Sequence, residues 1–243
     1  MERKSLKIIS WIPKYSVIPL ISGFLLNTLI YEGVMFFIKG RHQFDFTTNL
    51  DRAIPLVPSF VVIYLGCYIF WVFNYLLIAK QGKEHFYRFQ VADLTSRFIC
   101  LFFFLVIPTT NIRPELSLDG WADYALAFVW NIDPPMNLFP SIHCLVSWFC
   151  YIGIRGQKTI PKWYQRVSLI FAILVFLSTQ FTKQHYWIDV VGGVVIAELT
   201  YYLGRKTNLY HINAAFFEKL NQMLKIERGG DYNWDENKSK HDF

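Results

Sequence analysis

The stretch PLVPSFVVIYLGCYIFWVFNYLLIA, residues 55–79, carries no charged side chain and is the longest of several apolar blocks in the chain. A bilayer core about 30 Å thick is crossed by roughly 20 helical residues, so this block predicts a membrane-spanning helix. A transmembrane β-barrel would instead show short strands of alternating polarity. The block therefore favours a helical membrane protein.

Five further apolar blocks occupy residues 16–38, 98–108, 141–154, 167–181 and 187–203. Of the 243 residues, 53% are hydrophobic and 17% are charged, against roughly 25% charged in soluble domains. We predict an all-α fold, a polytopic membrane helical bundle of about six transmembrane helices. Residues 1–206 would form this six-helix membrane domain, and residues 207–243 a cytoplasmic amphipathic helix followed by a polar tail.

The net charge is +6, but the basic residues are dispersed between the apolar blocks, which argues against a nucleic-acid partner. The segment before the first block, the loops after the second and fourth blocks and the tail carry most of them, among them Lys80, Lys83, Arg155, Lys158 and Lys162. Cytoplasmic loops are enriched in lysine and arginine. We therefore predict that both termini are cytoplasmic and that the loop 109–140 is external, in an integral protein of the plasma membrane.

The run NLFPSIH, residues 137–143, closes this external loop and begins the fourth block. Pro140 near a first helical turn leaves backbone N–H groups pointing out of a helix N-terminus, which is a natural place for a phosphate. Ser141 adds a hydroxyl donor beside it, and His143 follows within reach of the same anion. The run thus predicts a phosphate site at the outer face.

A second run, STQFTKQHYWID over residues 178–189, joins the fifth and sixth blocks. If His185 opens the sixth helix, Asp189 lies on the same face four residues later and fixes the imidazole tautomer. That arrangement is typical of a nucleophile with its orienting group. Lys183 and, in the external loop, Arg113 would add positive charge for phosphoryl oxygens. The topology brings all of these residues to one membrane face, which indicates phosphoryl-transfer chemistry.

A metal site is the main rival, since two histidines and an aspartate are common zinc ligands. Arg113 and Lys183 would repel a divalent cation and attract an anion. We therefore expect no metal and no cofactor. The sequence Asp133-Pro134-Pro135 is interpreted as a rigid turn that leads into the Asn137 segment.

On these motifs the chain resembles the type 2 phosphatidic acid phosphatase superfamily of membrane lipid phosphatases and phosphotransferases. The signature of that family is Lys, six residues, Arg-Pro; then Pro-Ser-Gly-His; then Ser-Arg, five residues, His, three residues, Asp. The residues that match are Arg113-Pro114, Pro140-Ser141, His143, Ser178, His185 and Asp189. The chain departs from the signature at Val106, Ile142 and Thr179, where the family has lysine, glycine and arginine.

The resemblance implies roles for these residues. His185 would be the nucleophile that forms a phosphohistidine, Asp189 would support it and His143 would protonate the leaving group. The phosphate would be held by Arg113, Ser141 and the Pro140 segment, with Lys183 as a replacement for a missing family cation. The forms Phe-Pro-Ser-x-His and Lys-Gln-His-Tyr are similar to the branch of inositolphosphotransferases that make phosphorylceramides.

Three hypotheses for function follow. The leading one is a lipid phosphatase that hydrolyses a membrane lipid phosphomonoester or pyrophosphate through a phosphohistidine. The alternative is a phosphotransferase that moves a phospho-headgroup onto an alcohol acceptor, either a lipid or a polyol. A third, of another class, is a non-catalytic membrane binding or transport protein, against which the histidines and Asp189 argue.

Overall fold

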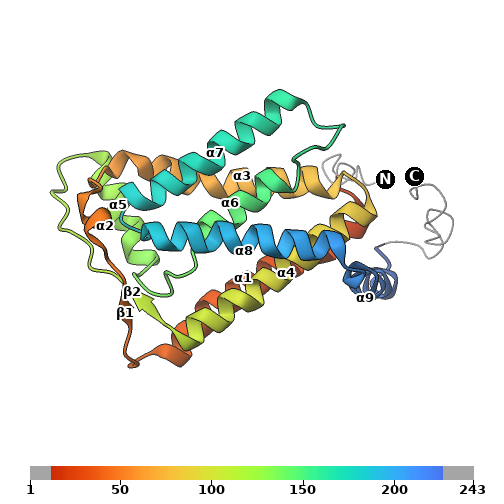
Figure 1. The fold of residues 1–243 in the computed structure, drawn as a ribbon, viewed down its shortest axis with the longest axis horizontal. Helices are drawn as coiled ribbons and strands as arrows, with labels where there is room; N and C mark the ends of the chain where they lie inside the picture. Colours follow the sequence, from red (N-terminus) through yellow and green to blue (C-terminus); the bar gives the residue numbers. More distant parts are fainter. Residues whose placement is uncertain (1–11, 227–243) are drawn as a thin grey trace, which may run out of the picture.

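The computed structural model describes residues 12–226, and these residues form a bundle of long helices (Figure 1). The predicted all-α membrane bundle is confirmed. The elements are η2 (Lys14–Ser16), α1 (Val17–Ile38), β1 (Phe44–Asp45), α2 (Asn49–Ala53), η3 (Pro58–Phe60), α3 (Val61–Ala79), α4 (Lys83–Val106), β2 (Thr109–Thr110), α5 (Trp121–Ile132), α6 (Ile142–Ile152), α7 (Lys162–Phe181), α8 (Trp187–Lys206) and α9 (Leu209–Met223). Strands β1 and β2 pair in parallel.

Five segments of the described chain are long and apolar enough to cross a membrane, namely Lys14–Ile38, Pro58–Ala79, Lys83–Val106, Lys162–Phe181 and Trp187–Lys206. The segment Lys83–Val106 is far longer than the apolar block 98–108 that predicted it. Its first half carries polar side chains that lie inside the bundle. Asp93 and Arg97, for example, are buried and form an ion pair of 2.8 Å. The fourth block forms α6, which has only 11 residues. The predicted six helices are thus five long ones and a short one.

Helix α6 lies within the bundle and packs against α3, α7 and α8, while α4 packs against α1, α8 and α9. The α6–α8 contact is a backbone contact at Gly193. A Cβ atom at this position would lie 2.7 Å from the carbonyl oxygen of Ser141. Only glycine therefore allows α8 to approach the start of α6 this closely.

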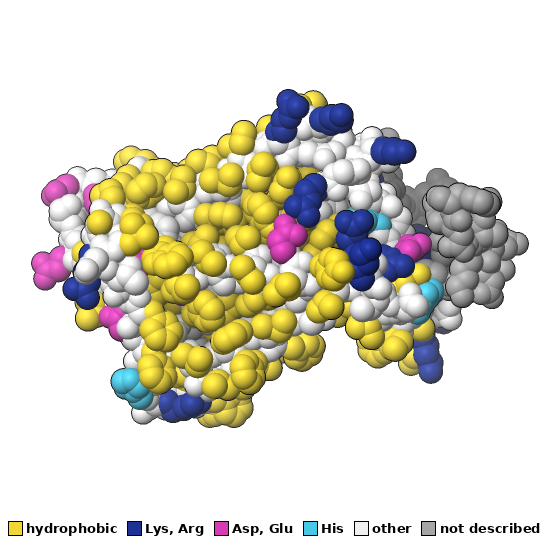
Figure 2. Space-filling view, in the orientation of Figure 1, with side chains coloured by type: hydrophobic (Ala, Val, Ile, Leu, Met, Phe, Trp, Pro, Cys, Tyr) yellow, Lys and Arg dark blue, Asp and Glu magenta, His cyan; other side chains and the backbone are white. Residues whose placement is uncertain are grey.

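The surface of the bundle has the pattern of a membrane protein. Hydrophobic side chains cover the middle of the face seen in Figure 2, and large ones on the spans are well exposed, with Phe36 at 80% and Ile69 at 78%. Most Lys and Arg side chains of that face lie toward the end that carries α9, here called the α9 end. The opposite end, the site end, carries α2, α5, β1 and β2 (Figure 1).

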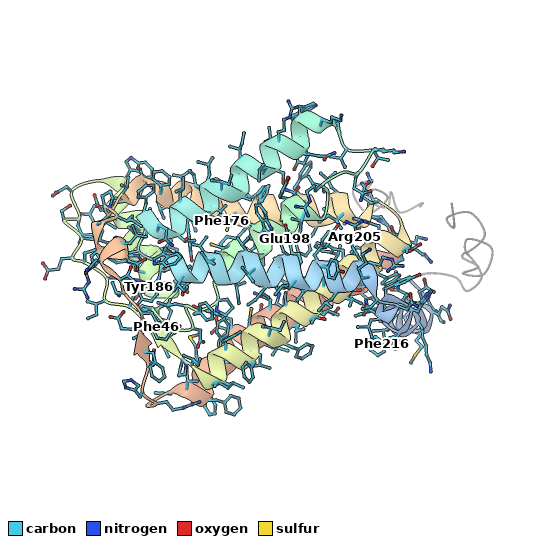
Figure 3. The ribbon with its side chains drawn as sticks, viewed as in Figure 1. Phe46, Phe176, Tyr186, Glu198, Arg205 and Phe216 are labelled. Atoms are coloured by element: carbon cyan, nitrogen blue, oxygen red, sulfur yellow. The ribbon has the colours of Figure 1, made fainter. Side chains whose placement is uncertain are left out.

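Helix α9 occurs where the sequence predicts an amphipathic helix. Tyr210, Ala214 and Phe217 are buried against the bundle, whereas Ile212 and Phe216 are exposed. Figure 3 shows Phe216 on α9 and Arg205 at the end of α8. The polar tail predicted after this helix lies outside the described residues, and the division of the chain at residue 206 stays a prediction.

Candidate active site

A cavity of about 210 Å³ lies between the middle of α1 and α3 and the segments that precede α6 and α8. Its walls come from α1, α3 and α6, from the end of α5, and from the two segments that lead into α6 and α8. Both histidines singled out from the sequence line it, together with Tyr31, Asp133, Asn137 and Gln184. The structure thus brings together segments that are far apart in the chain.

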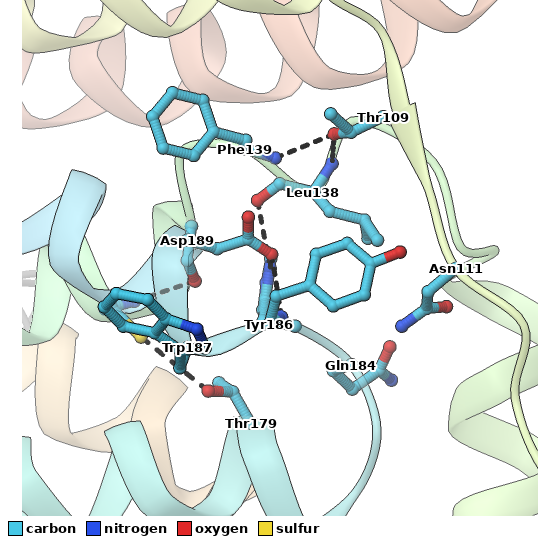
Figure 4. Close-up of polar contacts among 12 residues, drawn as sticks. Thr109, Asn111, Leu138, Phe139, Thr179, Gln184, Tyr186, Trp187 and Asp189 are labelled. Carbon is cyan, nitrogen blue, oxygen red and sulfur yellow. Dashed lines mark hydrogen bonds and ion pairs between the residues drawn. The ribbon is translucent and has the colours of Figure 1, made fainter. Parts of the chain in front are cut away.

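His185 precedes α8 and is held through one ring nitrogen. Its Nδ1 lies 3.0 Å from the carbonyl oxygen of Leu138 and 3.2 Å from Oδ2 of Asp189. Both partners accept hydrogen bonds, so Nδ1 carries the proton and Nε2 keeps a lone pair. The side chain of Asp189 is fully buried and also accepts from the backbone N–H of Tyr186 at 2.9 Å (Figure 4).

His143 lies in the first turn of α6, and its ring centroid is 5.8 Å from that of His185. The imidazole is enclosed by aromatic rings, with centroids at 4.5 Å for Tyr64 and 5.5 Å for Trp71. The hydroxyl of Tyr68 is 3.4 Å from its Nε2. One phosphate group between the two imidazoles could contact both.

Asp133 is a site residue that sequence analysis missed, because we interpreted it only as part of a turn. Its carboxylate lines the cavity and accepts hydrogen bonds from the hydroxyls of Tyr31 and Tyr64. Burial acts to raise the pKa of Asp133, but the charge of nearby His143 and the two hydroxyl donors outweigh it and lower the pKa below 3.8. A charged carboxylate therefore faces His143.

Ser141 and Pro140 lie behind the cavity wall. Ser141 is the N-cap of α6, where its Oγ accepts from the N–H of Cys144 at 3.3 Å and its own N–H donates to the carbonyl of Asp189 at 3.1 Å. Both residues are buried, and neither lines the cavity. The geometry makes Ser141 the link between the start of α6 and the start of α8.

Arg113 is close to the cavity but does not line it. Its guanidinium donates to the carbonyls of Trp130 at 3.1 Å and Asp133 at 2.8 Å, and to Oε1 of Gln184. Its Nε has no partner among the described residues. Arg113 thus acts on the cavity through the Gln184 amide.

Lys183 does not line the cavity either. Its amine donates to the carbonyl oxygens of Asp51, at 2.8 Å, and Ile54. Burial lowers the pKa of this amine, and the charge of Asp51 opposes the effect. In this geometry Lys183 fastens the loop before α8 to α2. A contact between Lys183 and a phosphate stays a prediction that the geometry does not favour.

The segment around β1 and α2 holds the His185 loop from outside, which the sequence did not indicate. Oδ1 of Asp51 accepts from the N–H of Trp187 at 2.8 Å, at the start of α8. The hydroxyl of Tyr186 lies 2.5 Å from Oδ1 of Asp45 and also contacts the carbonyl of Thr110. These contacts fix the side of the loop that follows His185, and the amine of Lys183 fixes the side that precedes it.

A hydroxyl at β2 holds the backbone of the segment before α6. Oγ1 of Thr109 accepts from the N–H groups of Leu138 and Phe139 at 2.8 and 2.9 Å (Figure 4). This places the carbonyl of Leu138 against His185 and turns Asn137, whose φ is 55°, into the cavity wall. Strand β2 therefore positions residues 137–139, which precede α6.

Of the three departures from the family signature, Ile142 lines the cavity and the other two do not. Val106 is 51% exposed at the end of α4, and Thr179 is buried and donates to the carbonyl of Phe176. Neither side chain lines the cavity. Within residues 12–226, no group of three or more His, Cys, Asp or Glu side chains is placed to hold one metal ion.

This fold and site define a helical membrane protein with a half-buried histidine pair and a supporting carboxylate. A family model described as PAP2 superfamily matches residues 43–203, more than half of the chain. The chain therefore belongs to the PAP2 superfamily, whose members have phosphatase-type or phosphotransferase-type activity. Comparison with curated proteins and with solved structures gives no match.

Proposed function

We propose that this protein is an integral membrane enzyme that cleaves a lipid phosphate through a phosphohistidine on His185. The observation that carries the proposal is the pair of imidazoles across one cavity, with His185 held at Nδ1 by Asp189 and Leu138. This leaves Nε2 of His185 as the nucleophilic atom. The buried charge of Asp189 stabilises the cation that forms as this nitrogen bonds to phosphorus.

The reaction has two steps. Nε2 of His185 attacks phosphorus, the N–P bond forms, and the bond between phosphorus and the lipid oxygen breaks. The protonated imidazole of His143 gives its proton to that oxygen, and the charge of Asp133 supports this protonated form. Neutral His143 then takes a proton from water or an alcohol, whose oxygen attacks phosphorus and breaks the N–P bond. Water makes the enzyme a phosphatase and an alcohol makes it a phosphotransferase.

The charge distribution also supports an orientation. The basic loops lie toward the α9 end, so this end would face the cytoplasm and the cavity would open at the outer face, in the plasma membrane. The bilayer itself would supply the lipid substrate to this site.

The test uses purified protein in detergent with a panel of labelled lipid phosphates, each with and without alcohol acceptors. Release of the lipid alcohol, with phosphate or a transferred headgroup as the second product, supports the proposal. The variant His185→Ala should release none. A wild-type protein that releases no product from any lipid, yet binds them, would favour the non-catalytic alternative.

A further inference from the structure

The cavity lacks the charges that usually hold a phosphate. No Lys or Arg is among its described lining residues, whereas Glu32 and Asp133 are. Arg113 and Lys183 direct their donors to carbonyl and amide oxygens instead. Any phosphate that reaches His185 must therefore find other donors.

Gln184 supplies one such donor. Its side chain is 2% exposed and lines the cavity. A guanidinium only donates, so the bond from Arg113 fixes Oε1 toward that residue and leaves Nε2 as the free end of the amide. This Nε2 has no hydrogen-bond partner among the described residues. The positive charge on Arg113 polarises the amide and strengthens Nε2 as a donor.

Asn137 supplies the second hydrogen-bond donor. Its side chain is also 2% exposed and lines the cavity, and neither of its polar atoms has a partner within residues 12–226. Buried amides without partners are rare in native proteins because they are costly. The N–H groups of the next two residues, Leu138 and Phe139, donate to Oγ1 of Thr109 and hold the backbone here, so the amide is preorganised beside the histidines.

We propose that Gln184 and Asn137 bind the nonbridging oxygens of the substrate phosphate, and that this neutral pair selects a singly charged phosphodiester headgroup over a terminal phosphate. The inference rests on the proposed function and specifies its substrate class. A terminal phosphate carries about −1.5 to −2 charges near neutral pH, and a phosphodiester carries one. Repulsion by Glu32 and Asp133 grows with that charge, and no Lys or Arg lines the cavity to offset it.

In this substrate the bond from phosphorus to the diacylglycerol oxygen breaks as the bond to Nε2 of His185 forms. The proton of His143 goes to the diacylglycerol, and the headgroup stays on phosphorus until water or an alcohol displaces the histidine. Free diacylglycerol is therefore the first product, and it appears whichever acceptor completes the reaction.

The experiment compares fluorescent diacyl lipids that carry a terminal phosphate, phosphoglycerol, phosphoethanolamine or phosphoinositol, with the purified full chain in detergent micelles. Diacylglycerol release is measured in single-turnover and steady-state reactions. We expect at least one phosphodiester to exceed the terminal phosphate in kcat/KM by about 10-fold or more. Removing an oxyanion donor typically lowers the rate roughly 100-fold, and we expect that loss for Gln184→Glu and for Asn137→Asp.

Both variants keep the size of the side chain, and Gln184→Glu also keeps an oxygen for Arg113. The matched control is Asn213→Asp, which adds the same charge on α9, where Asn213 donates to Gln90 far from the cavity; its kcat/KM should be unchanged. Near-normal kcat/KM in both cavity variants would overturn the proposal. If either cavity variant does not fold, the proposal is tested by the preference of the wild-type protein for a phosphodiester over a terminal phosphate.

Two failures are distinguishable. A preference for the terminal phosphate, with phosphate trapped on His185, would overturn the phosphodiester inference and leave the proposed function intact. No diacylglycerol from any lipid and no trapped phosphate would remove the proposed function, and this inference with it.

Discussion

The backbone contact between α6 and α8 makes Gly193→Ala an informative substitution. The added Cβ would lie 2.7 Å from the carbonyl oxygen of Ser141 and 3.1 Å from the backbone nitrogen of Leu145. These are backbone atoms, so no side-chain rotation relieves the clash. The helices must separate by about 0.7 Å before the closer contact reaches 3.4 Å, the lower limit of ordinary packing.

That separation would act directly on the site. The N–H of Ser141 donates to the carbonyl of Asp189, so the shift would move His143 relative to His185. Overpacking typically costs about 1–3 kcal/mol of stability, and a 1 Å misplacement of reacting groups lowers rates about 100-fold. We expect Gly193→Ala to reduce kcat by roughly 10- to 100-fold and to lower Tm by a few degrees.

The assay is turnover of a labelled lipid phosphate by purified protein, with Tm measured in the same detergent. Gly33→Ala is the matched control, because a Cβ at Gly33 in α1 would meet no atom within 4 Å; it should keep full activity and not lower Tm. Gly193→Ala with wild-type kcat would show that the α6–α8 contact does not set the distance between the histidines.

Three further predictions concern the supporting residues and the topology. Asp51→Ala removes the acceptor for the N–H of Trp187, which should destabilise the protein by about 1 kcal/mol and lower kcat several-fold; unchanged Tm and kcat would exclude this role. The pKa of Asp133 is lowered in the folded protein, so its stabilising effect is present above pH 3.8 and is lost as the pH falls through the lower folded value. The Tm difference between wild type and Asp133→Asn should therefore narrow as the pH falls below 3.8, and a constant difference would contradict this role. A cysteine replacing Asp119 should be labelled from outside the cell and one replacing Lys158 should not; the reverse pattern would invert the topology.

Much of the site was predictable because its signals are local. The spacing of His185 and Asp189 predicted their contact, which is observed at 3.2 Å. His185 does not open α8 as expected but precedes its N-cap, Tyr186. The run before His143 predicted the start of α6, which begins one residue after the N-cap Ser141.

The features of the site that the sequence did not predict depend on contacts between segments far apart in the chain. Tyr31 and Tyr64 reach Asp133 across 102 and 69 residues, so no local pattern marks that carboxylate as part of the site. The sequence predicted that the charge of Lys183 lies beside the phosphate. In the structure Lys183 has a positive φ, and its amine donates to a carbonyl of α2 instead. The apolar block 98–108 covers only the second half of α4, because the first half carries polar residues that lie inside the bundle and lower its hydropathy.

The most direct test of the covalent mechanism is to identify the histidine that carries phosphate. Purified protein would be mixed with an aryl phosphate, whose leaving group needs little protonation, quenched within milliseconds and mapped by mass spectrometry. We predict acid-labile phosphate on His185 in the wild type and, at a lower level, in His143→Ala, and none in His185→Ala. Phosphate on His143, or its persistence in His185→Ala, would contradict the assigned roles.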